Sequence, residues 1–299
     1  MRRLRVLSIA IASLALVASA CSEKARTSAT IPTAQKPPFP LNFDPTIFDR
    51  DSTTIDNQWW PLAPGAQLTW EGTAIDGEEE IERRIVFTVT DLTKEIAGVR
   101  TLVGWDQDFN DGILVESELI FLAQDKTGNV WHFGQYAELY DEEGQFDGGS
   151  AWLVGYLEGA KAGILMQANP QLGTPAYSEG FAPPPFFWDD FGRVYRMNQS
   201  TCVRAGCYTN VLIIEEFEPS ISDAFQLKYY APGVGSIRTG WRGEGEEEQE
   251  ELELIRKVQL TPAQLAAARA EAMKLEARAN VYGQTAPAQQ AASSPTPAG

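Results

Sequence analysis

The sequence predicts a mostly β protein, namely a single antiparallel β domain with one C-terminal helix. Three observations predict it. Apolar and polar side chains alternate along most segments between residues 67 and 260. Short turns rich in Gly, Asp, Asn and Pro separate these segments. A helical period occurs after residue 260. About ten strands are expected, in a curved half-barrel or a sandwich.

The first half reads as an antiparallel meander of five strands. The expected strands are residues 67–74, 81–90, 99–105, 113–123 and 130–139. Asp76-Gly77 and Asp111-Gly112 are dipeptides typical of tight hairpin turns, and Thr127-Gly128-Asn129 supplies a third turn. Residues 141–150 are acidic and glycine-rich, which predicts a surface loop.

The second half begins irregularly and then returns to strands. Residues 168–190 contain five prolines, including Pro183-Pro184-Pro185, and proline cannot lie in a central strand. Strands are expected at 191–197, 208–217, 225–231, 236–241 and 250–260. The glutamates between 244 and 253 are expected on a loop and on the exposed side of the last strand.

A helix is expected over residues 261–282. Thr261-Pro262-Ala263-Gln264 combines an N-cap residue, proline at the first helical position and the glutamine of a capping box. Leu265, Ala268, Ala272, Leu275 and Ala279 then recur at helical spacing. This narrow stripe is expected to pack on the sheet; the alternative is a helix that binds a partner.

Residues 1–20 have the features of an export signal. Arg2, Arg3 and Arg5 precede an apolar run from residue 6 to 20, which is shorter than the roughly 20 residues that span a bilayer. Ala18-Ser19-Ala20-Cys21 resembles a bacterial lipobox. In such signals the cysteine thiol receives a diacylglycerol and the peptide is cut before it. The alternative is an ordinary signal with a chance cysteine at the cleavage site.

The lipobox implies a lipid-anchored protein outside the cytoplasm, in the outer membrane if the source has one. Two or three acyl chains on Cys21, palmitate for example, would make a durable anchor. Residues 21–49 are then a lipidated cysteine and a flexible tether, residues 50–260 the β domain, and residues 283–299 a disordered tail rich in Ala, Pro and Gln.

Charge and cysteine content narrow the partners further. The net charge of −17 becomes −20 once the three arginines of the signal are removed, because −17 − 3 = −20. So much negative charge disfavours nucleic acid and anionic head groups. Cys202 and Cys207 form an even pair in an oxidising compartment, which predicts a structural disulfide rather than a redox motif.

Several motifs resemble those of an uncharacterised family of secreted bacterial proteins. They include Pro61-Leu-Ala-Pro-Gly65, Gln124-Asp-Lys-Thr-Gly-Asn-Val-Trp131 and Lys228-Tyr-Tyr-Ala-Pro-Gly-Val-Gly235. The resemblance covers roughly residues 55–258 and implies no activity, because none is established for that family. The strand and turn pattern with Pro-Leu-x-Pro-Gly also loosely resembles the half-barrels of lipoprotein carriers, at the level of fold alone.

Few residues suggest catalysis or metal binding. His132 lies between two aromatics in a strand, so core or surface packing is favoured over a ligand or base role. Asp106, Asp108 and Asn110 place oxygens at alternate positions, as a Ca²⁺ loop does, but the Asp111-Gly112 turn explains this stretch without an ion. Glu116 and Glu118 share a strand face, where a solvated surface is favoured over a hydrolase pair. No cofactor is otherwise predicted.

Aromatic residues outside the strand centres are the remaining clue to function. They either close the ends of the β structure or line a pocket for an apolar or sugar ligand. The set is Trp59, Trp60, Trp152, Phe186, Phe187 and Trp188. We therefore expect a non-enzymatic lipoprotein that binds an apolar ligand or lipid on an aromatic-lined β face. The alternatives are an assembly lipoprotein that binds another envelope protein, and a hydrolase of envelope polysaccharide.

Overall fold

The computed structural model describes residues 36–77, 79–279 and 285–291, which form one mostly β body. The predicted export signal and Cys21 lie outside the described residues. The described part contains one antiparallel sheet of 15 strands, five more than the sequence predicts. Among the described helices, none is long and apolar enough to cross a membrane.

The strands of the N-terminal half follow one another in space as they do in the sequence. They are β1 (Ala66–Asp76), β2 (Glu79–Ile96), β3 (Val99–Asn110), β4 (Ile113–Gln124), β5 (Val130–Tyr140), β6 (Phe146–Leu153) and β7 (Lys161–Met166). The turn at Asp111 and Gly112 has φ values of 48° and 83°, as a two-residue hairpin turn requires. The segment expected to be a loop at 141–150 instead enters β6, which pairs with β5.

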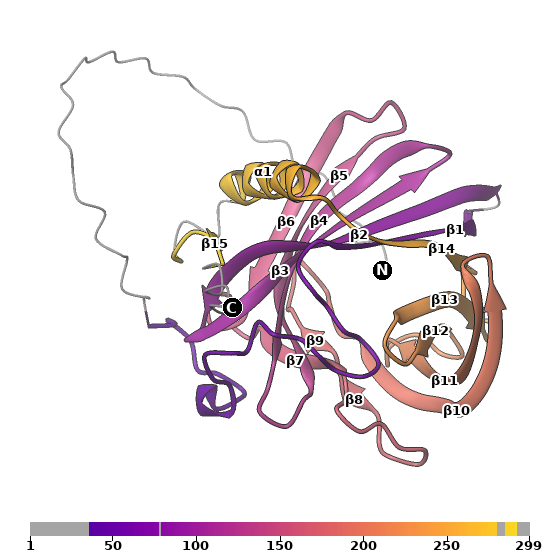
Figure 1. Cartoon of the computed structure of the whole chain (residues 1–299), viewed down its shortest axis with the longest axis horizontal. Coiled ribbons are helices and arrows are strands. Elements are labelled where there is room, and N and C mark those ends of the chain that lie inside the picture. Colours follow the sequence, from indigo (N-terminus) through magenta and orange to yellow (C-terminus); the bar gives the residue numbers. More distant parts are fainter. Residues whose placement is uncertain (1–35, 78, 280–284, 292–299) are drawn as a thin grey trace, which may run out of the picture.

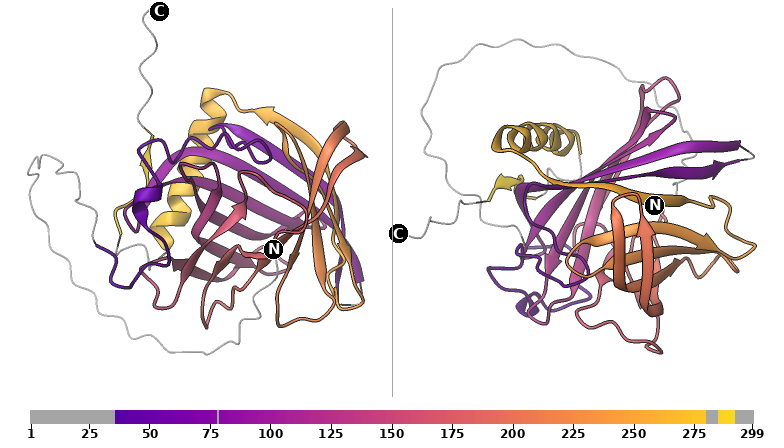
Figure 2. Two further views of the ribbon diagram at one scale, coloured as in Figure 1. Left: turned by 90° about the horizontal axis from the view of Figure 1, so that it is seen from below. Right: turned by 45° about the vertical axis from the view of Figure 1, so that its right-hand side comes forward.

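The C-terminal half extends the same sheet past its first strand. It comprises β8 (Tyr177–Ser178), β9 (Gly180–Phe181), β10 (Phe191–Val203), β11 (Gly206–Phe217), β12 (Phe225–Ala231), β13 (Gly235–Arg242), β14 (Glu251–Gln259) and β15 (Gln289–Gln290). Because β14 pairs with β1, the strands from β10 to β14 continue into those from β1 to β5. Figures 1 and 2 show that the resulting sheet curls strongly around its interior.

The period-2 alternation places each side chain on one of two faces. On β4, Ile120 and Leu122 belong to the core cluster of the inner, concave face, with Trp70 and Phe87. The alternate residues Leu119 and Phe121 belong to a second cluster, on the outer face beneath the helix. Both faces of the central strands are therefore buried.

Helix α1 (Pro262–Arg278) lies on the outer face, as predicted (Figure 1). Both hydrogen bonds of the Thr261–Gln264 capping box are formed. Ala272 and Leu275 pack into the outer cluster. Beneath the helix, the Lys94 ammonium lies 2.7 Å from the Glu276 carboxylate in a buried ion pair. The helix thus covers the sheet rather than presenting its apolar stripe to a partner.

The flexible tether predicted for residues 21–49 extends too far, because its last residues pack on the sheet. Phe43 and Phe48 pack edge-on against Phe133 on the outer face. Part of the predicted disordered tail is also ordered, because Gln289 and Gln290 pair with β2. In both cases a few side chains find partners on a sheet surface that is formed by residues far away in the sequence.

A short kinked segment ties the two ends of the sheet together. β8 pairs with β10 at one end, β9 pairs with β7 at the other, and Glu179 is the residue between β8 and β9. Two glycines permit the close approach of this segment. A β-carbon at Gly163 would overlap the backbone of Gly180, and one at Gly192 would press against the Glu179 carboxylate. We call Tyr177–Phe181 the seam.

Candidate binding site

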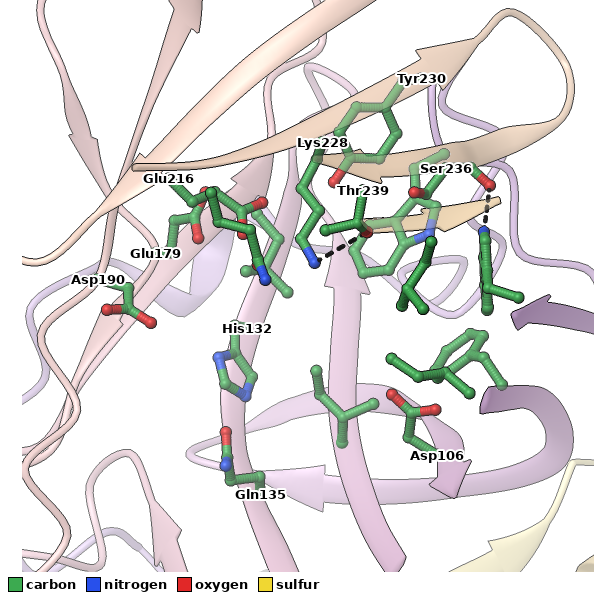
Figure 3. A pocket seen from close by; sticks show the side chains of 18 of the residues that line it. Asp106, His132, Gln135, Glu179, Asp190, Glu216, Lys228, Tyr230, Ser236 and Thr239 are labelled. Carbon is green, nitrogen blue, oxygen red and sulfur yellow. Dashed lines mark hydrogen bonds between the residues drawn. The ribbon is translucent and has the colours of Figure 1, made fainter. Parts of the chain in front are cut away.

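The concave side of the sheet encloses a cavity of about 180 Å³ (Figure 3). Its walls come from strands throughout the sheet and from the segments that carry Trp60, Trp188, Glu246 and Glu248. Apolar side chains form much of the wall, among them Trp60, Trp70, Ile85, Phe87, Ile120, Leu165, Phe217 and Leu252. Such a mixture of apolar walls and a few polar groups is typical of small-molecule sites.

His132 lies at one side of this cavity, fully buried on β5. Its Nε2 lies 3.0 Å from the carbonyl oxygen of Gly134, which fits a neutral ring that donates from Nε2. Burial lowers the pKa of His132 to about 4, so the ring is neutral at physiological pH. The rings of Trp152 and Trp188 lie edge-on to it, with centroids 5.0 and 5.6 Å away.

Buried polar atoms without a hydrogen-bond partner gather around this histidine. They are Gln135 Oε1, Trp152 Nε1, Tyr177 Oη, Glu179 Oε1 and Trp188 Nε1, whereas the His132 ring has the backbone of Gly134 and Glu179 as partners. His132, Gln135, Glu179 and Trp188 line the cavity itself. Because buried polar groups in native proteins are nearly always satisfied, this concentration indicates that bound water or a ligand completes the site.

Carboxyl groups lie next to these atoms. Glu179 is 2% exposed, and Figure 3 shows its side chain beside that of Glu216. Burial, reinforced by Glu216 and Asp190, raises the pKa of Glu179 well above its usual range. Burial also raises the pKa of Glu216, against the opposing effect of Lys228. The Lys228 ammonium lies 3.5 Å from the Thr239 hydroxyl.

A wider cleft of about 1100 Å³ adjoins the cavity. Both hollows are lined by Trp188, Asp190, Glu246 and Glu248, so the cleft is continuous with the cavity. Further acidic residues of the cleft are Asp76, Glu218 and Glu247. The approach to the cavity is therefore strongly acidic.

The six aromatic residues that were predicted to line a pocket or close the β structure lie in different places. Trp60 and Trp188 line the cavity, whereas Trp59 is buried in the inner core. Trp152 forms a small cluster in which Phe186 and Trp188 also pack. Phe187 is 69% exposed and lines the outer cleft.

The predicted calcium ligands lie on a strand rather than on an ion-binding loop. Arg83 donates to Asp108 Oδ2 at 2.6 Å and to Asn110 Oδ1 at 3.2 Å, so a guanidinium already bridges two of the three candidates. The third, Asp106, lines the cavity. In the part of the chain that the structure describes, no three His, Cys, Asp or Glu side chains are grouped to hold a metal ion.

Two other predictions about acidic residues are wrong. Glu118 is 1% exposed rather than on a solvated face, since the inner face of β4 is covered by the curved sheet. Glu250, expected on a loop or an exposed strand face, is buried and lies 2.6 Å from Arg83 Nε. Burial acts to raise the pKa of Glu250, but the charge and hydrogen bond of Arg83 together with the charge of Lys228 lower it.

The disulfide prediction is confirmed. Cys202 and Cys207 are directly opposed near the turn between β10 and β11 and are joined by a bond. Neither residue lines the cavity. The bridge therefore fastens a hairpin and takes no part in the site.

Sequence reasoning missed Glu179, Glu216 and Lys228. Glu216 lies two residues after the apolar Ile214 on β11, and Lys228 is paired with Ile214 on the neighbouring strand. Glu216 and Lys228 therefore lie on the same sheet face as core residues, and a charged residue at such a position is a sign that could have indicated both. Glu179 lies in a proline-interrupted segment without periodicity, so no local pattern marks it.

No protein-family model matches the chain, and no curated protein is similar to it. Among solved structures, one similar chain is a candidate exported protein with a YmcC-like fold from Bacteroides fragilis NCTC 9343. It is 14% identical, the match covers 68% of this chain and 99% of that chain, and the TM-score is 0.36. A candidate lipoprotein from Parabacteroides distasonis ATCC 8503 is 12% identical over 70% of this chain and 100% of its own, with a TM-score of 0.36.

Proposed function

We propose that this protein is a lipid-anchored binding protein of the bacterial cell envelope that holds a small ligand with an apolar body. The lipobox ending in Cys21 supports the anchor and the location outside the cytoplasm. The observation that carries the binding role is the cavity on the concave face, with aromatic walls beside buried polar atoms that lack partners.

The size of the cavity limits the ligand. A dry cavity of about 150 Å³ suffices to bind benzene in another protein. The cavity of about 180 Å³ therefore accommodates one aromatic ring or a short alkyl chain. A longer ligand would extend toward the acidic cleft that adjoins the cavity.

The binding role is tested with 2-phenylethanol as the probe, by isothermal titration calorimetry on the mature chain. Leu165→Trp adds an indole inside the cavity and is expected to weaken binding by at least about tenfold, because overpacked sites admit less ligand. Leu172→Trp, at a position 59% exposed, is the matched control and should bind like the unmodified chain. Equal binding of the probe by Leu165→Trp and the unmodified chain would show that the cavity is not the binding site.

The anchor has a separate test. Cys21→Ser should move the protein from the membrane fraction to the soluble fraction and remove the mass of the acyl chains from its N-terminal peptide. A free thiol at Cys21 in the native protein would contradict the anchor and leave the binding role standing.

A further inference from the structure

The charge around the cavity is unbalanced. Among the described residues that line it, Lys228 is the one Lys or Arg, against six acids: Asp106, Glu179, Asp190, Glu216, Glu246 and Glu248. Removing carboxylates from water is expensive unless a cation or hydrogen-bond donors compensate. The excess of acid over base in the cavity wall therefore favours a cationic ligand.

Glu179 is the most informative member of this set. The seam holds it between the two ends of the sheet, its Oε1 has no hydrogen-bond partner, and it is almost wholly buried at the cavity wall. Figure 3 shows Glu179 and Glu216 close together at one side of the cavity, with Asp190 nearby. Gly192 leaves room for this carboxylate where any larger residue would displace it. The backbone is thus shaped around a carboxyl group whose Oε1 accepts no hydrogen bond from the described residues.

The surroundings of these acids suit an organic cation. Trp188 and Tyr230 line the same cavity, and aromatic rings attract ammonium groups that lie over their faces within about 6 Å. The adjoining acidic cleft would raise the local concentration of cations and speed their entry.

We infer that the cavity binds an amphiphilic amine, whose ammonium group lies between Glu179 and Glu216 and whose small apolar body contacts the aromatic wall. This inference rests on the proposed binding function and names its ligand class. The ammonium supplies the missing donors to Glu179 Oε1 and neutralises the paired acids. Burial raises the pKa values of both carboxyls, in keeping with acids whose charge is poorly compensated within the protein.

The test compares three probes with the same ring and different head groups: phenethylamine, 2-phenylethanol and 3-phenylpropionate. Calorimetry at pH 7.5 should show the amine binding at least about tenfold more tightly than the alcohol, as a charge-assisted hydrogen bond would provide. The propionate should bind most weakly.

Glu179→Gln keeps the shape of the side chain and removes its charge. It should reduce amine affinity to that of the alcohol and leave alcohol affinity unchanged. Glu142→Gln, on an exposed loop, changes the net charge equally and should preserve the amine preference. Glu216→Gln provides a second variant if Glu179→Gln does not fold.

The outcomes separate the two proposals. Equal affinity for amine and alcohol, or an amine preference that survives both glutamine variants, overturns the amine assignment while binding itself stands. Tightest binding of 3-phenylpropionate also overturns it and identifies Lys228 as the anchoring group. If none of the three probes binds, the binding function fails together with the assignment.

Discussion

Acidic side chains of β3 and β4 face one another across the inner sheet surface. Asp106 is paired with Glu118 and Asp108 with Glu116 in directly opposed positions. Arg83 reaches Asp108, whereas the hydrogen bond of Glu118 is to another carboxyl group, that of Glu116, and requires a proton on Glu118. Burial, together with Glu116 and Asp106, raises the pKa of Glu118 well above its usual range. Like charges at such spacing destabilise a sheet unless protons or cations are shared.

Glu118→Gln is expected to stabilise the protein at neutral pH. The folded state holds the Glu118 proton more tightly than the unfolded chain, whose glutamates titrate near about 4.3. The contribution of protonated Glu118 to the free energy of unfolding is therefore fully present below the pKa of the unfolded chain. It is lost as the pH rises through the raised pKa of the folded state. Glutamine does not ionise, so the variant avoids this loss.

Urea unfolding of both proteins at pH 4 and pH 7.5 measures the effect. The variant should have the higher midpoint at pH 7.5, and the difference should shrink toward pH 4. Glu142→Gln, exposed on its loop, should leave the midpoint unchanged at both values. A variant less stable than the wild type at pH 7.5 would show that the Glu118 carboxylate has a compensating partner.

The seam is a short element that contributes directly to the site. The Tyr177–Phe181 segment joins strands at the two ends of the sheet and places Glu179 at the cavity wall. Its backbone passes so close to β7 that only glycine fits at position 163. The local sequence gives no strand pattern there, because the seam depends on edges supplied by β7 and β10.

Gly163→Ala is expected to lower stability by about 1–3 kcal/mol, the usual cost of an overpacked site. The added methyl group would overlap the backbone of Gly180 and of Glu179 and push the seam outward. Urea unfolding measures the loss, and hydrogen exchange should show faster exchange of amides in residues 177–181. Gly240→Ala is the control, since its nearest neighbour would be a Tyr229 ring atom at 3.7 Å. Equal stability of the two variants would refute a tight seam.

The whole molecule carries a formal net charge of −17, and the cleft and the inner sheet face concentrate part of it. Self-repulsion of this size opposes the compact state, and dissolved ions reduce it. The distance over which charges repel one another falls from about 30 Å at 0.01 M salt to about 10 Å at 0.1 M. The repulsion is therefore reduced within salt concentrations that are easily used in an experiment.

The melting temperature should therefore rise as NaCl increases from roughly 10 to 500 mM at pH 7.5. The rise should be smaller at pH 4.5, where part of the carboxylates are protonated and the repulsion is already reduced. Differential scanning calorimetry at both pH values measures this. A melting temperature that falls with salt at pH 7.5 would mean that surface ion pairs outweigh the net repulsion.

Several features of this protein were determined by the sequence itself, because they depend on neighbours a few residues apart. The alternation on β4, the Asp111-Gly112 turn, the Thr261–Gln264 capping box and the Cys202–Cys207 bridge are local in this sense. Short-range sterics, hydrogen bonds and side-chain periodicity fix such features wherever the segment folds.

Only the tertiary structure decided the site. Curvature of the sheet buries Glu118 and Glu250, which the sequence alone places on exposed faces. Pairing across the sheet brings Asp108 within hydrogen-bond distance of Arg83. Glu179, Glu216 and Lys228 meet because β11, β12 and the seam approach one cavity from separate parts of the chain. Burial and long-range charge depend on which strands become neighbours, and side-chain periodicity within one strand carries no such information.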